Sequence, residues 1–128
     1  MKYLLDTHVL LWGAFDSRRL GRKTRSILTN ASEVYFTSIS VAEINLKSKL
    51  KLEAPASEII KLAGQEGLEE LGFSSLHSEQ IPRFGSLTKH DPFDRMILAQ
   101  AAAEGLTLLT ADEVLLDLGF SWVQDARL

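Results

Sequence analysis

The sequence predicts an α/β protein with a mostly parallel central sheet of about five strands, flanked by helices on both faces. Two observations predict this arrangement: short apolar segments typical of strands, and the longer segments of helical periodicity that alternate with them. Parallel strands need a crossover connection, usually a helix, between one strand and the next. The alternation therefore favours a parallel sheet covered on both sides.

Composition indicates one globular domain spanning residues 1–128. The chain has 128 residues, of which 45% are hydrophobic and 24% charged, which suits a single core. It contains no cysteine, and this excludes disulfides, zinc–thiolate sites and cysteine nucleophiles. The first apolar stretch, residues 3–12, is too short and too polar for a membrane span and lacks a signal-peptide pattern. We expect a cytoplasmic protein with no membrane contact.

The first half of the chain contains five predicted elements. They are a buried strand at 2–6, a helix at 7–15, an amphipathic helix at 20–30, a strand at 33–37 and a helix at 41–49. Ser38 or Ser40 is the expected cap of the last of these helices.

The second half continues the alternation. Pro55 suits the first turn of a helix and Gly67 its end. The expected elements are a helix at 55–66, a strand at 68–73, a short helix at 76–84, a loop at 85–90, an apolar helix at 93–104, a strand at 106–110, a short helix from residue 112 and an edge strand at 120–124.

Four acidic residues follow strands or begin helices in this scheme. Asp6 closes the first strand, Glu43 lies early in the helix after the second strand, Asp94 lies in the first turn of the apolar helix, and Asp112 follows the 106–110 strand. Ligands of open parallel sheets bind beyond the carboxyl ends of the strands. We therefore expect these four side chains to converge in one pocket.

Clustered carboxylates repel one another, and burying them unpaired costs several kcal/mol, as an order of magnitude. No lysine or arginine is obviously placed to neutralise all four. Mg²⁺ or Mn²⁺ would do so, because hard divalent cations take carboxylate oxygens and water. A metal held in this way suits phosphodiester hydrolysis.

Each residue also has a structural interpretation. Asp6 and Asp112 could be helix N-caps, and Asp94 and Glu43 could be first-turn acids favoured by the helix dipole. Thr110 could be an ordinary β-branched strand residue.

The other polar residues give weaker signals. His8 and His90 suit packing or hydrogen bonding better than metal ligation. The formal net charge of −3 counts against a nucleic-acid partner, but the basic run Arg18–Arg25 could contact a phosphate backbone.

Four segments resemble, in order, the motifs of PIN domains in the VapC-like toxin branch. They are Leu4-Leu-Asp-Thr-His-Val-Leu-Leu-Trp12, Ser38-Ile-Ser-Val-Ala-Glu-Ile44 followed by Lys47, His90-Asp-Pro-Phe-Asp-Arg-Met-Ile-Leu-Ala-Gln-Ala101, and Leu108-Leu-Thr-Ala-Asp112. The third is the most specific. Two departures are Ala42, where many relatives carry tryptophan, and the tail from residue 115, which matches poorly.

The resemblance implies a PIN fold, an endoribonuclease dependent on Mg²⁺ or Mn²⁺, a homodimer and a cognate antitoxin partner. It maps the acidic ligands of the family onto Asp6, Glu43, Asp94 and Asp112 and a companion hydroxyl onto Thr110. Asp91 is expected to cap the apolar helix rather than serve as the third acid.

The expected mechanism places the metal on the three aspartates, with Glu43 as a ligand or water-orienting base. Thr110, with Thr7 as a second candidate, would fix a carboxylate or a water molecule by hydrogen bonds. RNA ends carrying 5′-phosphate and 3′-hydroxyl groups are implied by the family.

Three alternatives remain open at this point. A haloacid-dehalogenase-type phosphatase needs Asp-x-Asp after its first strand, but residue 8 is histidine. A receiver domain needs an aspartate after its third strand and a lysine after a later one, where this chain has Ser74, Ser75 and Thr110. A non-catalytic RNA- or protein-binding PIN-like module is the third alternative.

Overall fold

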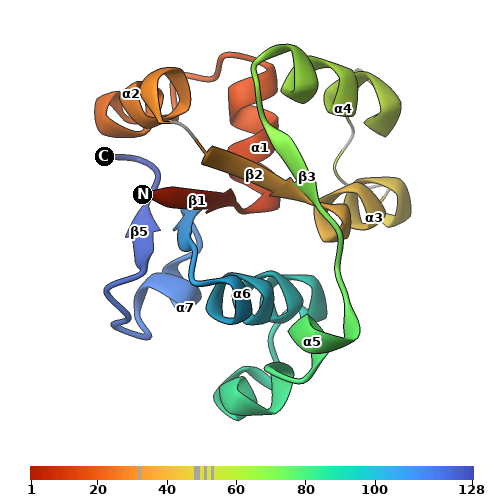
Figure 1. Ribbon diagram of the computed structural model, residues 1–128, viewed down its shortest axis with the longest axis vertical. Helices are drawn as coiled ribbons and strands as arrows, with labels where there is room; N and C mark the ends of the chain where they lie inside the picture. The colour runs from red at the N-terminus through yellow and green to blue at the C-terminus, as the bar shows by residue number, and fades with distance from the viewer. Residues whose placement is uncertain (32, 48–49, 51, 53) are drawn as a thin grey trace.

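The computed structural model describes residues 1–31, 33–47, 50, 52 and 54–128. Within these residues, a single sheet is covered by helices on both faces, as Figure 1 shows. The predicted fold class is confirmed, and the sheet is parallel throughout rather than mostly parallel.

The sheet has five strands in the order β3-β2-β1-β4-β5. Their bounds are Lys2–Leu5 for β1, Glu33–Thr37 for β2, Glu69–Leu71 for β3, Thr107–Thr110 for β4 and Val123–Asp125 for β5. The first strand is therefore central, with β2 and β4 as its hydrogen-bonded neighbours. This arrangement brings the ends of β1 and β4 side by side.

Alternate side chains of β1 enter two separate hydrophobic clusters. Tyr3 and Leu5 pack into one cluster, and Leu4 packs into the other. Successive side chains of a strand point to opposite faces of the sheet. Leu108 and Leu109 of β4 divide between the clusters in the same way, so both faces of the central strands are buried.

The helices form two layers. Above the sheet in Figure 1 lie α1 (Thr7–Ala14), α2 (Arg22–Asn30) and α4 (Ala56–Gln65). Below it lie α5 (Ser75–Ser78), the 3₁₀ helix η2 (Ile81–Leu87), α6 (Pro92–Glu104) and α7 (Glu113–Leu116). Helix α3 (Ser38–Leu46) contacts α1, α4 and α6. No helix of the described residues combines the length and the apolar character needed to traverse a bilayer.

Local sequence explains the limits of α6, the longest helix of the described residues. The Asp91 side chain accepts a hydrogen bond from the Phe93 backbone, which caps the helix, and Pro92 occupies the first turn. Gly105 ends the helix with φ of 66°, a left-handed conformation that glycine adopts without steric cost. The expected capping role of Asp91 is confirmed.

Several predicted boundaries were wrong. The helix expected at 41–49 begins at Ser38 because Thr37, not Ser38 or Ser40, caps it, and it ends at Leu46. Residues 48 and 49 lie outside the described residues. The helix expected at 20–30 begins at Arg22.

The segment from 76 to 90 differs most from the prediction. The expected helix at 76–84 is divided between α5 and η2, and the expected loop at 85–90 begins inside η2. Phe84 has non-helical backbone angles, which kinks this segment while its ring stays buried. The last strand lies at 123–125 instead of 120–124, since its pairing with β4 sets its register.

Candidate functional site

A cleft of about 610 Å³ lies beyond the carboxyl ends of β1 and β4. The structure brings all four predicted acids into it. The lining residues are Asp6, His8, Trp12, Glu43, Lys47, Leu50, Asp91, Asp94, Ala111, Asp112 and Arg127. The expected convergence of distant carboxylates is therefore present.

Asp6 directly follows β1 and caps α1. Its Oδ1 accepts a hydrogen bond from the Thr7 backbone N–H at 2.7 Å, and its Oδ2 accepts one from the Thr110 hydroxyl at 2.6 Å. The residue is only 3% exposed. Burial raises the pKa of Asp6, although the hydrogen bonds from Thr110 and Thr7 oppose the shift. A nearby positive charge would therefore strongly favour the carboxylate.

Thr110 connects two of the acids. Besides donating to Asp6, its hydroxyl oxygen accepts a hydrogen bond from the Asp112 backbone N–H at 3.0 Å. The side chain of Thr110 is completely buried at the end of β4. The expectation that this hydroxyl fixes a carboxylate agrees with the geometry.

Glu43 is held from two sides. It belongs to the second turn of α3 and is 3% exposed. Its Oε1 accepts a hydrogen bond from the Thr7 hydroxyl at 2.6 Å, and its Oε2 lies 2.7 Å from Lys47 Nζ. The Ser40 hydroxyl lies 2.9 Å from that of Thr7. This network fixes the orientation of the Glu43 carboxylate.

Lys47 supplies a positive charge that the sequence did not reveal. Its ammonium group contacts both Glu43 and Asp91. Burial alone would lower the pKa of Lys47, but hydrogen bonds to Asp91 and Glu43 outweigh it and raise the pKa. The i,i+4 spacing of Glu43 and Lys47 on one helix was an available signal. The contact with Asp91 depends on tertiary structure.

Asp91 and Asp94 have different environments. Burial would raise the pKa of Asp91, yet the hydrogen bonds from Lys47 and the Phe93 backbone lower it, so Asp91 is a stabilised carboxylate. The pKa of Asp94 is raised to about 8, mainly by burial and further by the negative charges of Asp6, Glu43 and Asp112. Of these two carboxyl groups, Asp91 is paired with a lysine, whereas Asp94 has no lysine or arginine partner among the described residues.

Asp112 caps α7 and faces the cleft with its second oxygen. Its Oδ1 accepts hydrogen bonds from the Val114 and Leu115 backbone at 2.8 and 3.3 Å. Its Oδ2 lies 3.2 Å from His90 Nε2, which is also 3.3 Å from Asp94 Oδ2. His90 thus lies between two of the predicted acids, within hydrogen-bonding distance of Asp112.

The donor set suits a hard divalent cation. Within the described residues, no lysine or arginine forms an ion pair with Asp6, Asp94 or Asp112. The ligand atoms of His90, Asp94 and Asp112 all lie within 4.8 Å of one another. Carboxylate oxygens at this spacing, together with water, are ligands that Mg²⁺ and Mn²⁺ take. The residues present therefore fit the expected metal.

Arg127 is a further cleft residue, and it comes from the tail whose sequence gave no motif. Its guanidinium pairs with Asp125 and Glu113, each at 2.8 Å. At the cleft wall, Arg19 stacks over Trp12 with 5.8 Å between its guanidinium carbon and the ring centre. Basic groups thus stand close to the acidic centre.

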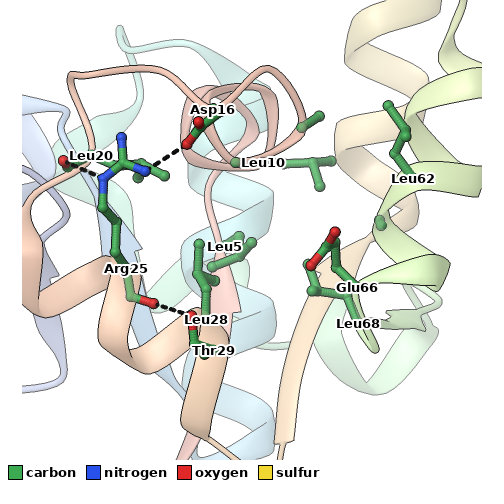
Figure 2. Close-up of a pocket in the computed structure, with 13 residues that line it drawn as sticks. Leu5, Leu10, Asp16, Leu20, Arg25, Leu28, Thr29, Leu62, Glu66 and Leu68 are labelled. Atoms are coloured by element: carbon green, nitrogen blue, oxygen red, sulfur yellow. Dashed lines mark hydrogen bonds and ion pairs between the residues drawn. The ribbon is translucent and has the colours of Figure 1, made fainter.

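The basic run Arg18–Arg25 is not a uniform exposed surface. Figure 2 shows Arg25 at a separate cavity of about 330 Å³, beside Leu28 and Thr29 of α2. Its guanidinium is bound by Asp16 and by backbone oxygens. The guanidinium of Arg25 therefore already has partners within the protein, whereas the side chains of Arg18 and Arg19 are exposed.

Fold and cleft together define an α/β domain with an acidic pocket at the carboxyl edge of a parallel sheet. The sequence profile of the PIN domain family matches residues 3–121. The chain therefore belongs to the PIN domain family. No curated protein sequence matches the chain.

Solved structures share the fold of this chain. A chain of DNA-bound VapBC from Salmonella typhimurium has a TM-score of 0.62 and 22% identity, with 86% of each chain covered. A chain of VapBC2 from Rickettsia felis, bound to a promoter DNA fragment, has a TM-score of 0.67 and 19% identity, with 93% of this chain and 94% of that chain covered. A chain of a toxin–antitoxin complex from Klebsiella pneumoniae has a TM-score of 0.65 and 19% identity, with 98% of each chain covered. At these identities the likeness shows the fold.

Proposed function

We propose that this PIN domain is a divalent-metal-dependent endoribonuclease and the toxin of a toxin–antitoxin pair. One observation carries the proposal. The cleft of a PIN domain holds Asp6, Asp94 and Asp112 together with no lysine or arginine paired to them among the described residues. Such a set of carboxylates is stable at neutral pH only when a cation or protons compensate their repulsion.

Asp6, Asp94 and Asp112 would hold the metal, with Glu43 as a further ligand or a water-orienting base. Bound there, Mg²⁺ or Mn²⁺ would supply positive charge that stabilises the developing charge of a phosphodiester. Thr110 and the Thr7 backbone fix both oxygens of Asp6. The protein thereby restrains the carboxylate before substrate arrives, as outer hydrogen-bond partners of metal ligands do.

Glu43 has the surroundings of a water-orienting group. The Thr7 hydroxyl and Lys47 hold one oxygen each, so the carboxylate does not rotate freely. In hydrolysis, water attacks the phosphorus, a proton of that water passes to Glu43, and the bond to the 3′ oxygen breaks. The leaving oxygen takes a proton from solvent, giving 5′-phosphate and 3′-hydroxyl ends.

RNA would reach the cleft along its basic wall. Arg18 and Arg19 are exposed, and Arg19 covers Trp12, which lines the cleft. Phosphate contacts release counterions and make binding salt-dependent, by about one unit of slope per contact. Replacing Arg18 and Arg19 with glutamine should reduce the salt slope of RNA binding.

The antitoxin part of the proposal draws on the structural neighbours, which are VapBC or toxin–antitoxin complexes. We assign this chain the toxin role because it carries the acidic PIN cleft. Co-expression with the product of an adjacent small gene should yield a copurifying complex in which RNA cleavage is suppressed. Failure to copurify would count against the toxin role and leave the nuclease role intact.

The proposal also includes one domain over residues 1–128, a cytoplasmic location and a homodimer. Light scattering behind a sizing column should give twice the chain mass of 14.2 kDa. A mass equal to one chain would contradict the homodimer.

A cleavage assay tests the nuclease directly. Asp6→Asn and Asp94→Asn should each reduce cleavage of transfer, ribosomal or messenger RNA by at least about 100-fold, since each removes a proposed metal ligand. Excess EDTA should abolish cleavage by the unaltered protein. Asp117→Asn, at an exposed aspartate outside the cleft, is the control. Full activity in either cleft variant, with circular dichroism unchanged, would refute the assignment.

A further inference from the structure

We infer that His90 is itself a metal ligand, together with Asp94 and Asp112, and that its nitrogen makes the site bind Mn²⁺ in preference to Mg²⁺. The inference rests on the proposed function and deepens it, because it assigns a nitrogen ligand and a preferred metal to the same cleft. The His90 imidazole lies between carboxylates that come from two different helices.

The spacing of the three side chains fits one ion. His90 Nε2 lies 3.3 Å from Asp94 Oδ2 and 3.2 Å from Asp112 Oδ2. Two ligands at right angles around an octahedral ion, with bonds of roughly 2.1 Å, are about 3 Å apart. The three atoms therefore already have nearly the mutual distances of neighbouring ligands.

The local structure positions each of the three residues. The His90 N–H donates to Leu87 O at 2.9 Å, which anchors it to the buried end of η2. Asp94 belongs to the first turn of α6, and the Asp112 Oδ1 is occupied in capping α7. Each residue thus presents its remaining ligand atom from a fixed backbone.

Asp6 and Glu43 are oriented by other partners. Hydrogen bonds from Thr7 and Thr110 restrain the two oxygens of Asp6, and Thr7 and Lys47 hold the two oxygens of Glu43. By contrast, the Oδ2 atoms of Asp94 and Asp112 both face the same imidazole nitrogen. The most compact set of ligand atoms in the described residues therefore contains one nitrogen and two oxygens.

A nitrogen ligand changes the metal preference. Mg²⁺ is hard, dehydrates reluctantly and prefers oxygen donors. Mn²⁺ also takes carboxylates but belongs to the transition series, whose members accept imidazole more readily than Mg²⁺ does. A site with His90 in its first coordination sphere should therefore favour Mn²⁺.

Pulsed electron paramagnetic resonance of the full chain loaded with substoichiometric Mn²⁺ tests direct ligation without an activity assay. A coordinated imidazole should produce a nitrogen coupling that changes when histidine is labelled with ¹⁵N. The coupling should disappear in His90→Ala and persist in His8→Ala, which removes another imidazole of the same cleft. The label test uses the unaltered protein, so it does not depend on the folding of a variant.

Calorimetric titration with Mn²⁺ and with Mg²⁺ tests the preference. We expect His90→Ala to weaken Mn²⁺ binding by about 10-fold or more, because loss of even an outer hydrogen-bond partner of a metal ligand typically costs about 10- to 100-fold. Mg²⁺ affinity should change by less than about threefold, because oxygen ligands remain. The ratio of the two affinities is the quantity to compare with that of His8→Ala.

The outcomes separate this inference from the proposed function. If Mn²⁺ binds in a way that requires Asp94 but shows no histidine nitrogen coupling, His90 is not a ligand and only the inference fails. Tighter binding of both ions by His90→Ala would overturn it too, since the imidazole would then compete with the metal. If neither ion binds, or Asp94→Asn binds them as tightly, the proposed function itself fails.

Discussion

A single hydroxyl, that of Thr110, contacts both Asp6 and Asp112. Valine at this position keeps the β-branched shape but removes the donor to Asp6 and the acceptor for the Asp112 N–H. Thr110→Val should lower the free energy of unfolding by about 1–3 kcal/mol and slow RNA cleavage by about 10- to 100-fold. Urea denaturation and the cleavage assay measure the two effects.

Thr107→Val is the matched control for that substitution. Thr107 lies on the same strand and is also buried, but it does not line the cleft. An equal loss of activity in both variants would show that Thr110 acts only through general stability of the strand.

Asp94 makes stability depend on pH in the absence of metal. Its pKa is raised from 3.8 to about 8, so the folded protein binds this proton more tightly than the unfolded chain does. The stabilising contribution is complete below about pH 4 and is lost as the pH rises through about 8. In EDTA, the urea midpoint of the unaltered protein should therefore fall over this window relative to that of Asp94→Asn.

Asp117→Asn should follow the unaltered protein in that experiment, because Asp117 is exposed and lies outside the cleft. Comparison with Asp94→Asn cancels the titration of other groups, including Asp91, whose lowered pKa acts in the opposite sense. Parallel curves for the unaltered protein and Asp94→Asn would contradict the prediction.

The four acids could be proposed as a set because each was expected just after a strand or in the first turns of a helix, and the resemblance to PIN domains added Thr110. Their neighbours could not. Lys47 reaches Asp91 across 44 positions, and His90 reaches Asp112 across 22. Such contacts depend on how α3 and α6 pack together and on where η2 ends. No periodic pattern within one element contains that information.

Two glycines illustrate opposite effects at the scale of helices. Gly105 has φ of 66° after α6, whereas Gly64 lies inside α4 with open space where a Cβ would stand. Gly105→Ala should destabilise the protein by about 1 kcal/mol because alanine resists the left-handed conformation. Gly64→Ala should stabilise it by up to about 1 kcal/mol through higher helix propensity.

Thermal unfolding of both glycine variants measures the difference. The paired design separates backbone conformation from the simple addition of a methyl group. A stabilised Gly105→Ala would contradict the role given to the C-terminal cap of α6.

Elements with strong local signals were predictable, and those defined by distant pairing were not. Helix α6 has a cap, Pro92 and Gly105 at its ends, and its predicted and observed limits nearly coincide. The segment 76–90 has Pro82 and Gly85 but no clear helical period, and tertiary packing of Phe84 and Leu87 decides its shape. The register of β5 likewise depends on β4.

Metal binding should appear in the stability of the whole molecule. A ligand that binds only the folded state adds about 2.7 kcal/mol when its concentration is 100 times Kd. Saturating Mn²⁺ or Mg²⁺ should therefore raise Tm of the unaltered protein and of Asp117→Asn. The rise should be much smaller in Asp94→Asn, and scanning calorimetry with and without the ion is the measurement.

An equal rise in Asp94→Asn would place the stabilising ion elsewhere. Calcium at the same concentration is a useful further comparison, because Ca²⁺ prefers longer bonds and more oxygen ligands than Mg²⁺ does.

The sheet order was the part of the whole fold that alternation alone left undetermined. Alternating strands and helices predict a parallel sheet, but many orders satisfy that pattern. The observed order β3-β2-β1-β4-β5 places β1 centrally. From β1 the chain adds β2 and β3 on one side, and it then crosses to the other side to add β4 and β5. Ligand sites of open α/β sheets occur at such a switch point, which is where Asp6 lies.

The central place of β1 has a consequence for biosynthesis. Its partner β4 ends at Thr110, so the hydrogen bond between Thr110 and Asp6 joins residues separated by 104 positions. A chain growing on the ribosome therefore contains Asp6 long before it acquires Asp94, Thr110 and Asp112. Prematurely terminated products that stop before β4 would lack Thr110 and Asp112, so nascent polypeptides complete the cleft only after β4 and the start of α7 have been synthesised.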